Sequence, residues 1–151
     1  MDAIRDFEDI LVLFGKHSVR YLIVGGLAFI FHAKPRYTKD IDLWVDSGEE
    51  NVVRANRALE EFGSPQFLTV DDADEVLQLG AAPSRIDILR SVVALSFEEA
   101  WPRRIQSNYG RAAALWIDLE SLLAIKSAID HPRHQEDARV LMAVRDRQKH
   151  G

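Results

Sequence analysis

Apolar side chains recur along much of the chain at the three- and four-residue spacing that is typical of helices. Ser96 followed by Glu99 forms a capping-box pattern, and Asp118 is a typical residue at a helix start. Gly15 and Pro132 are expected to end two helices, because glycine and proline interrupt helical structure. Together these signals predict helices over residues 2–15, 27–32, 49–62, 96–104, 119–131 and 135–147.

Short runs rich in β-branched and aromatic residues predict the strands. These runs cover residues 19–24, 38–46, 67–70, 75–79, 85–89 and 115–117, the last as a short edge strand. In the second run Asp40, Asp42, Trp44 and Asp46 should face one way and the apolar residues between them the other. The pattern predicts a mixed α+β fold, in which a small mixed β-sheet is flanked by helices and followed by C-terminal helices.

The composition is that of an ordinary globular protein. With 151 residues, 47% hydrophobic and 28% charged, the chain is expected to form one globular domain over residues 1–151. About 1–95 would form the sheet core with the site, and about 96–149 a helical part packed on it. A net charge of −5 gives no general attraction to polyanions, and the absence of cysteine excludes disulfides and thiolate chemistry.

The start and the longest apolar run of the chain are not those expected of a membrane protein. The acidic start, MDAIRDFEDI, does not resemble a signal peptide. The longest apolar stretch, residues 21–31, is too short to span a bilayer and is interrupted by glycines. We therefore expect a soluble cytoplasmic protein without a membrane partner.

Two aspartates at positions i and i+2 of one predicted strand are the first sign of chemistry. Asp40 and Asp42 would present both carboxylates on one face, where they could bind Mg²⁺, an ion that prefers oxygen ligands. Asp87, in the predicted strand RIDIL, could supply a third carboxylate to a two-metal site. An aspartate that only pairs with Arg85 or Arg90 would give the same pattern, and both interpretations stay open at this point.

The glycine pair Gly25-Gly26 follows an apolar run and precedes a predicted helix. Glycine lets the backbone approach a ligand closely, and the N–H groups at a helix start can bind phosphate oxygens. A glycine pair alone more often marks a tight turn between a strand and a helix. The glycine pair gains significance from its position, because only thirteen residues, 27–39, separate it from Asp40.

This arrangement, VGG, thirteen residues and then DIDL, resembles the signature of the DNA polymerase β-like nucleotidyltransferase superfamily. The stretch PRYTKDIDLWVD is similar to a minimal group related to type IV abortive-infection toxins of the AbiEii kind. The later stretch DLESLLAIKSAIDHPRHQEDARVL resembles the second half of that group, which places Lys126 and Asp137 at its helical lysine and closing aspartate. The resemblance covers about residues 19–143.

The resemblance implies an enzyme that transfers a nucleotide monophosphate from an NTP to a hydroxyl group and releases pyrophosphate. Asp40, Asp42 and Asp87 would bind Mg²⁺, with Mn²⁺ as the alternative ion, and would be the catalytic residues. The NTP would be bound by Gly25, Gly26, Arg36, Thr38 and Lys126. The acceptor, a protein, a tRNA or a small molecule, is not specified by the sequence, and an antitoxin protein would be a partner of the toxin branch.

The chain departs from the family pattern in two places. Gly26 stands where many members have serine, so a hydroxyl contact to phosphate is lost. The turn that resembles R-P-K-D reads HPRH at residues 131–134 and lacks the aspartate. These departures leave a role for Lys126 open, and its spacing alone favours an exposed pair with Asp130 at i+4. Arg36 and Thr38 could equally be a surface charge and a loop hydrogen bond.

Two other hypotheses remain beside the enzyme. One is an inactive module with this fold that binds a nucleotide or a protein, and the other is a structural module whose acidic strand pairs with basic residues. Trp44 is expected to pack against a neighbouring helix, with a place near the nucleotide base as the alternative, and Trp101 and Trp116 are expected to be core or interface aromatics. The acidic turn at 71–74 is expected to be solvated. His131 and His134 do not have the spacing of metal ligands.

Overall fold

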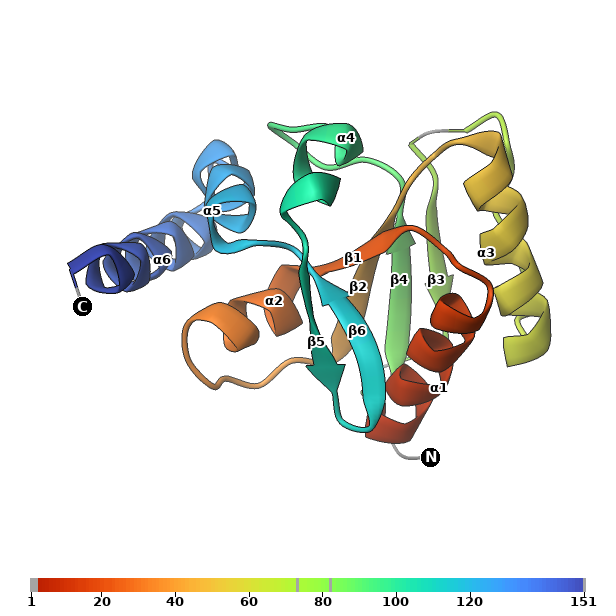
Figure 1. Ribbon diagram of the computed structural model, residues 1–151. Helices are drawn as coiled ribbons and strands as arrows, with labels where there is room; N and C mark the ends of the chain where they lie inside the picture. Colours follow the sequence, from red (N-terminus) through yellow and green to blue (C-terminus); the bar gives the residue numbers. More distant parts are fainter. Residues whose placement is uncertain (1–2, 73, 82, 151) are drawn as a thin grey trace.

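The computed structural model describes residues 3–72, 74–81 and 83–150 (Figure 1). Residue 2, at the start of the first predicted helix, and Ala73, in the acidic turn, lie outside this part. The described elements are α1 Ala3–Lys16, β1 Tyr21–Val24, α2 Gly25–His32, β2 Asp40–Val45, α3 Glu49–Phe62, β3 Val76–Leu79, β4 Arg85–Leu89, α4 Phe97–Ala100, the 3₁₀ helix η1 Trp101–Arg103, β5 Ile105–Tyr109, β6 Ala112–Trp116, α5 Leu119–Ala128 and α6 Pro132–His150.

Six strands form one sheet in the order β3-β4-β2-β1-β6-β5. β2 pairs in parallel with β4 and β1 pairs in parallel with β6, whereas the other neighbours are antiparallel. The central strands β1 and β2 are joined through α2, which returns the chain beside the strand that it has just left. The mixed α+β fold predicted from the sequence is therefore confirmed, and β2 and β4 lie next to each other inside the sheet.

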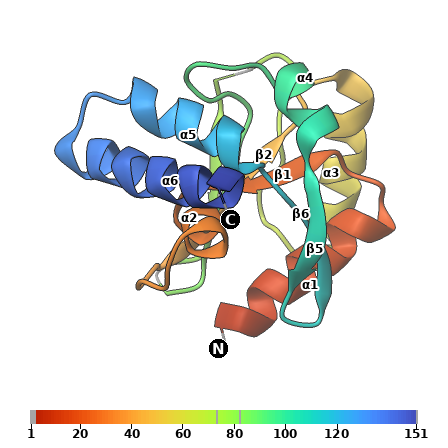
Figure 2. The ribbon, with the colours of Figure 1, turned by 60° about the vertical axis from the view of Figure 1, so that its left-hand side comes forward.

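The helices fall into two groups around the sheet. α1 and α3 pack against each other, and α1 also packs on β6. α2 packs on β1 and β2, and the antiparallel pair α5 and α6 lies against α2, away from α1 and α3 (Figures 1 and 2). The core between them contains fully buried large side chains from α1, α3 and the central strands, among them Phe14, Leu22, Ile41, Leu59 and Ile88. Burial of this apolar surface supplies the main stabilisation of the fold.

Several local predictions are confirmed by the observed contacts. α3 spans Glu49–Phe62 as its apolar spacing predicts. Ser96 accepts a hydrogen bond from the N–H of Glu99, whose side chain accepts one from the N–H of Ser96, so the capping box is complete. Asp118 accepts a hydrogen bond from the N–H of Ser121 at the start of α5.

The strand predicted at residues 67–70 is wrong, because side chains satisfy the backbone groups there in place of a neighbouring strand. The amide side chain of Asn56 bonds both the N–H and the C=O of Leu68, at 2.9 and 3.0 Å. The buried guanidinium of Arg90 donates to the carbonyl oxygens of Thr69 and Val70. A segment held by side chains in this way has no need of strand partners.

Several element boundaries and the order of two strands also differ from prediction. Gly15 lies inside α1, which ends at Lys16. Pro132 begins α6 instead of only ending the preceding helix, and a proline is well tolerated in a first turn, where its missing N–H is not needed. β6 is not an edge strand, since it lies between β1 and β5, and β5 itself, Ile105–Tyr109, was not predicted.

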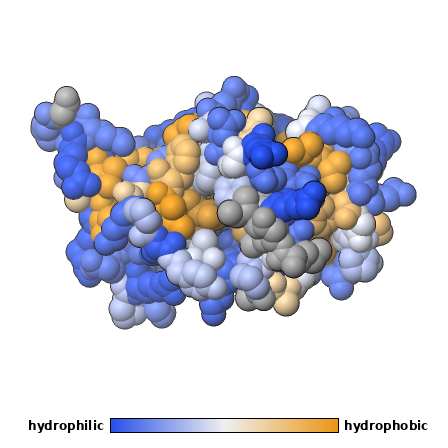
Figure 3. Space-filling model, turned by 90° about the horizontal axis from the view of Figure 1, so that it is seen from below, coloured by the Kyte–Doolittle hydropathy of each residue, from blue (hydrophilic) through white to orange (hydrophobic). Residues whose placement is uncertain are grey.

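The surface is mixed in character. Seen from below, it is mostly hydrophilic, with hydrophobic residues in patches (Figure 3). Large exposed apolar side chains are spread over several elements, for example Val12 on α1, Val53 on α3 and Met142 on α6. Among the helices in the described part of the chain, each is too short or too polar to cross a membrane.

Candidate active site

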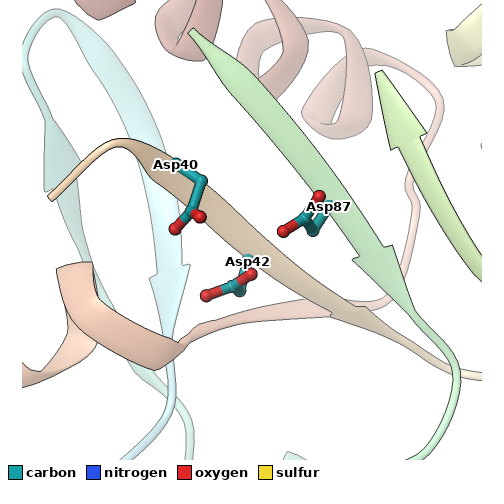
Figure 4. A group of neighbouring side chains, drawn as sticks. All are labelled: Asp40, Asp42 and Asp87. Carbon is teal, nitrogen blue, oxygen red and sulfur yellow. The ribbon is translucent and has the colours of Figure 1, made fainter. Parts of the chain in front are cut away.

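The three aspartates come together because β2 and β4 run in parallel and in register. Asp42 lies directly opposite Asp87, and Asp40 lies opposite Arg85. The carboxylates of Asp40, Asp42 and Asp87 point toward one another from the two strands (Figure 4). One oxygen of each lies within 4.8 Å of the others. Within the described residues no second group of three possible metal ligands occurs, the acidic turn near residue 72 included.

Toward the end of β2, the face that bears Asp40 and Asp42 carries side chains that pack or pair within the protein. Trp44 is 1% exposed and makes an edge-to-face contact with Phe97, with 5.2 Å between the ring centroids. Asp46, just past the strand, pairs with Arg20 at 3.3 Å. Trp44 therefore packs against α4, as expected, and the acidic part of this face that lies beside Asp87 is limited to Asp40 and Asp42.

Gly25 and Gly26 begin α2 directly beside the carboxylates. Gly25 has φ +69°, and a Cβ there would lie 2.0 Å from Oδ2 of Asp42. A Cβ on Gly26 would lie 2.9 Å from the hydroxyl oxygen of Thr38. Only glycine fits at the first position without strain, since it combines a left-handed backbone with a close contact. The backbone N–H groups at the start of α2 thus lie next to the acidic cluster.

The acidic cluster is electrostatically strained without a cation. Burial raises the pKa of Asp42 to about 7, and the negative charges of Asp40 and Asp87 act in the same direction. Arg85 opposes them, because its Nη2 lies 2.7 Å from Asp40 and 3.1 Å from Asp87. The pairing of Asp87 with Arg85, left open by the sequence, is therefore present together with the cluster, whereas Arg90 bonds backbone carbonyls.

The residues present fit a divalent cation. Oδ1 of Asp87 is buried and has no hydrogen-bond partner within the described residues. Such a carboxylate oxygen is costly to bury unless a cation or donor meets it. Three converging carboxylates are also the hard oxygen donors that Mg²⁺ and Mn²⁺ accept.

A second charged cluster lies nearby, in which one aspartate is surrounded by basic side chains. Asp137 of α6 is 4% exposed and accepts two hydrogen bonds from Arg36, at 2.8 and 3.1 Å. Its Oδ2 also lies 2.9 Å from Nζ of Lys126, which is itself 5% exposed and lies 3.2 Å from Nδ1 of His134. Burial alone would raise the pKa of Asp137, but hydrogen bonds from Arg36 and Lys126 lower it.

This cluster corrects the spacing argument for Lys126. An exposed i, i+4 pair with Asp130 is wrong, because the lysine is buried and binds an aspartate of the next helix. Arg36 is not a free surface charge either, since it binds Asp137 in a bidentate manner and its guanidinium lies 4.0 Å from the centre of the Phe29 ring. Asp137 therefore joins α6 to α5 and to the loop after α2.

The predicted site residues, except Asp87, line one polar cleft of about 520 Å³. Asp87 is buried beside it at 5% exposure. Four residues that the sequence did not assign to the site also line the cleft: Tyr37, Lys39, Arg133 and His134. The first two flank Thr38 and could have been found from that proximity. Arg133 and His134 belong to the turn HPRH, which the family resemblance also covers, but only the packing of α6 on α5 brings them here.

An apolar cavity of about 280 Å³ adjoins the polar cleft. Asp42 and Lys126 line both. The apolar walls come from the end of β4, the loop after it and α5, for example Leu89, Val92 and Leu122. Asp42 therefore lies between the polar cleft and the apolar cavity.

Comparison with solved structures shows which fold this is. The crystal structure of ANT(2″)-Ia in complex with adenylyl-2″-tobramycin matches with a TM-score of 0.59, covering 97% of this chain and 91% of that one at 16% identity. The fold is nucleotidyltransferase-like. No protein-family model and no curated protein matches the chain. The likeness lies in the arrangement of strands and helices, and in this chain the acidic triad lies on β2 and β4 of that arrangement.

Proposed function

We propose that this protein is a metal-dependent nucleotidyltransferase, which transfers a nucleotide monophosphate from an NTP to a hydroxyl group and releases pyrophosphate. The observation that carries this proposal is the position of Asp40, Asp42 and Asp87 beside the glycine start of α2 in a nucleotidyltransferase-like fold. Carboxylates next to the N–H groups at a helix start suit a substrate that combines phosphates with a divalent ion.

In this proposal the polar cleft binds the triphosphate. The N–H groups of Gly25 and Gly26 donate to the β- and γ-phosphates, and Thr38 adds its hydroxyl. Arg36 and Lys126 neutralise phosphate charge, as cations do in other phosphoryl-transfer sites. The cleft supports this assignment, because all five residues line it.

Asp40, Asp42 and Asp87 would hold Mg²⁺ or Mn²⁺, which would supply positive charge to the reacting phosphate and to the acceptor hydroxyl. The acceptor oxygen forms a bond to the α-phosphorus while the bond from that phosphorus to the β-phosphate oxygen breaks, and pyrophosphate leaves. The acceptor proton passes to Asp87. Its buried, unpaired Oδ1 supports this role, because that oxygen can accept a proton without losing a hydrogen bond within the described residues.

The acceptor is the open part of the proposal. A small molecule is supported by the fold match, since ANT(2″)-Ia was crystallised with adenylyl-2″-tobramycin. The sequence resemblance to abortive-infection toxins supports instead a protein or tRNA acceptor and an antitoxin partner. An inactive module that binds a nucleotide alone would keep the cleft but transfer no label.

The proposal is tested by incubating the protein with radiolabelled NTPs and Mg²⁺ and, in turn, with cell extract, tRNA or a panel of aminoglycosides as acceptors. We expect label on one acceptor class, and Asp42→Asn should reduce it at least a hundredfold. Asp71→Asn, which alters an exposed carboxylate in the acidic turn, is the matched control and should leave labelling unchanged. Labelling that survives in Asp42→Asn would exclude these carboxylates as the catalytic group, and NTP binding without any labelled acceptor would favour the inactive module.

A further inference from the structure

Arg85 is an unusual neighbour for a metal-binding cluster. It is the first residue of β4, and its Nη2 donates to Oδ2 of Asp40 at 2.7 Å and to Oδ2 of Asp87 at 3.1 Å. One guanidinium nitrogen thus bridges two of the three carboxylates that would ligate an ion. Both Oδ2 atoms are occupied by hydrogen bonds that a divalent ion on the same oxygens would have to replace.

The anchoring of Arg85 differs from that of the other arginines near the site. Its side chain is 37% exposed, and the interactions seen for it in the described part of the chain run through Nη2, while its Nε has no partner there. Arg36, in contrast, is held by two hydrogen bonds to Asp137 and by the ring of Phe29. Arg85, which is more exposed and has no aromatic contact of this kind within the described residues, can therefore turn away into solvent more readily than Arg36.

We propose that Arg85 is a built-in competitor for the divalent-ion site. In the ion-free protein it neutralises part of the charge on Asp40 and Asp87, and it releases both carboxylates when an ion binds. The proposal rests on one part of the proposed function, namely that Asp40, Asp42 and Asp87 bind a divalent ion. It makes no use of an NTP or an acceptor.

The competition has a measurable consequence. Two cations repel each other strongly at short range in a partly buried site, so the guanidinium weakens ion binding even after it has moved aside. Removal of its charge should tighten binding of Mn²⁺ about tenfold, a moderate effect because the released side chain is exposed to screening solvent. Without Arg85 the three carboxylates also repel one another more, so the ion-free protein should melt at a lower temperature.

The test is a titration of the purified chain with Mn²⁺ alone, followed by electron paramagnetic resonance, for wild type, Arg85→Gln and Arg85→Lys. We expect Arg85→Gln to bind Mn²⁺ about tenfold more tightly, and Arg85→Lys to resemble wild type because it keeps the charge. Arg57→Gln, which removes an exposed arginine of α3, is the control for net charge and should change the affinity less than twofold. Melting curves with and without Mn²⁺ should show the largest ion-induced rise for Arg85→Gln.

Equal or weaker Mn²⁺ binding by Arg85→Gln would overturn the proposal, and so would a lack of binding in every variant. Binding that tightens equally in Arg57→Gln would show a net-charge effect and would overturn it too. These outcomes are separate from the labelling test. Tighter Mn²⁺ binding without any labelled acceptor would count against the proposed function alone, and labelling with unchanged Mn²⁺ affinity would count against the role of Arg85 alone.

Discussion

Asp42 and Asp137 are two aspartates of the same small region with opposite surroundings. Asp42 lies among carboxylates, and its pKa is raised to about 7 by burial and by their charge. Asp137 lies between Arg36 and Lys126, whose hydrogen bonds lower its pKa against the effect of burial. The protein therefore supplies cations to one carboxylate and leaves the other to be completed from outside. We infer that Asp137 holds Arg36 and Lys126 in place, whereas Asp42 serves ligand binding.

Among the tests of this contrast, Asp137→Asn should have the largest effect on stability. It leaves Arg36 and Lys126 without their buried counter-charge, and breaking a buried ion pair costs about 3–5 kcal/mol. We therefore expect the free energy of unfolding, measured with urea, to fall by about 3 kcal/mol. Asp130→Asn is the matched control on the exposed residue that the spacing had suggested, and it should change stability by less than about 0.5 kcal/mol. A larger effect of Asp130→Asn would restore the spacing argument for Lys126.

A second test changes the backbone beside Asp42 without touching a charge. In Gly25→Ala the new Cβ meets the carboxylate of Asp42, and the residue also keeps a positive φ. We expect a loss of about 2–3 kcal/mol in denaturant unfolding together with loss of nucleotide transfer. Gly63→Ala is the control, because Gly63 also has positive φ but its Cβ would meet no heavy atom of the described chain within 4 Å. It should lose only about 1 kcal/mol.

The smallest expected effect has the opposite sign. Asp42→Asn should stabilise the ion-free protein by about 1 kcal/mol above pH 7, since it removes a charge that burial and neighbouring carboxylates disfavour. The folded pKa of Asp42 lies above its unfolded value of 3.8, so the folded state holds the proton more tightly. Its stabilising contribution is present at low pH and is lost as the pH rises through about 7.

Urea unfolding in EDTA at pH 6 and pH 8 measures this effect. Wild type should lose stability between the two values, and Asp42→Asn should lose less. Asp137 does not change the free energy of unfolding between pH 6 and pH 8. Its pKa is lowered, so the stabilisation that it contributes is lost only at acid pH. An equal slope in both proteins would show that Asp42 is not the group that titrates.

The sequence predicted the carboxylates better than the cations. Asp40, Asp42 and Asp87 stand in short alternating strands, and alternation alone assigns a face to each. The register that sets Asp42 opposite Asp87 depends on the parallel pairing of β2 with β4, which β3 and α3 separate along the chain. Lys126 was misjudged because its partner, Asp137, lies in the next helix, beyond Pro132, where helical spacing gives no guide.

The same limit explains the errors in the fold. Residues 67–70 have strand-like composition, but Asn56 and Arg90, both distant in sequence, bond their backbone. β5 was missed since IQSNY contains few apolar residues, and its place beside β6 comes from the hairpin that joins them. Local pattern therefore predicted the elements with a regular spacing of apolar residues. It failed where distant side chains bond the backbone, as at residues 67–70, and where a strand has few apolar residues, as in β5.

The position of Asp137 in the last helix also bears on how the protein is made. A ribosome releases the chain from its N-terminus, so the strands with the three clustered aspartates emerge before β6, which completes the middle of the sheet beside β1. Arg36 and Lys126 must wait longer still, until α6 is available. During synthesis the strands that carry the three aspartates therefore leave the ribosome before Asp137, and the ion pairs of Asp137 with Arg36 and Lys126 can form only after that residue has emerged.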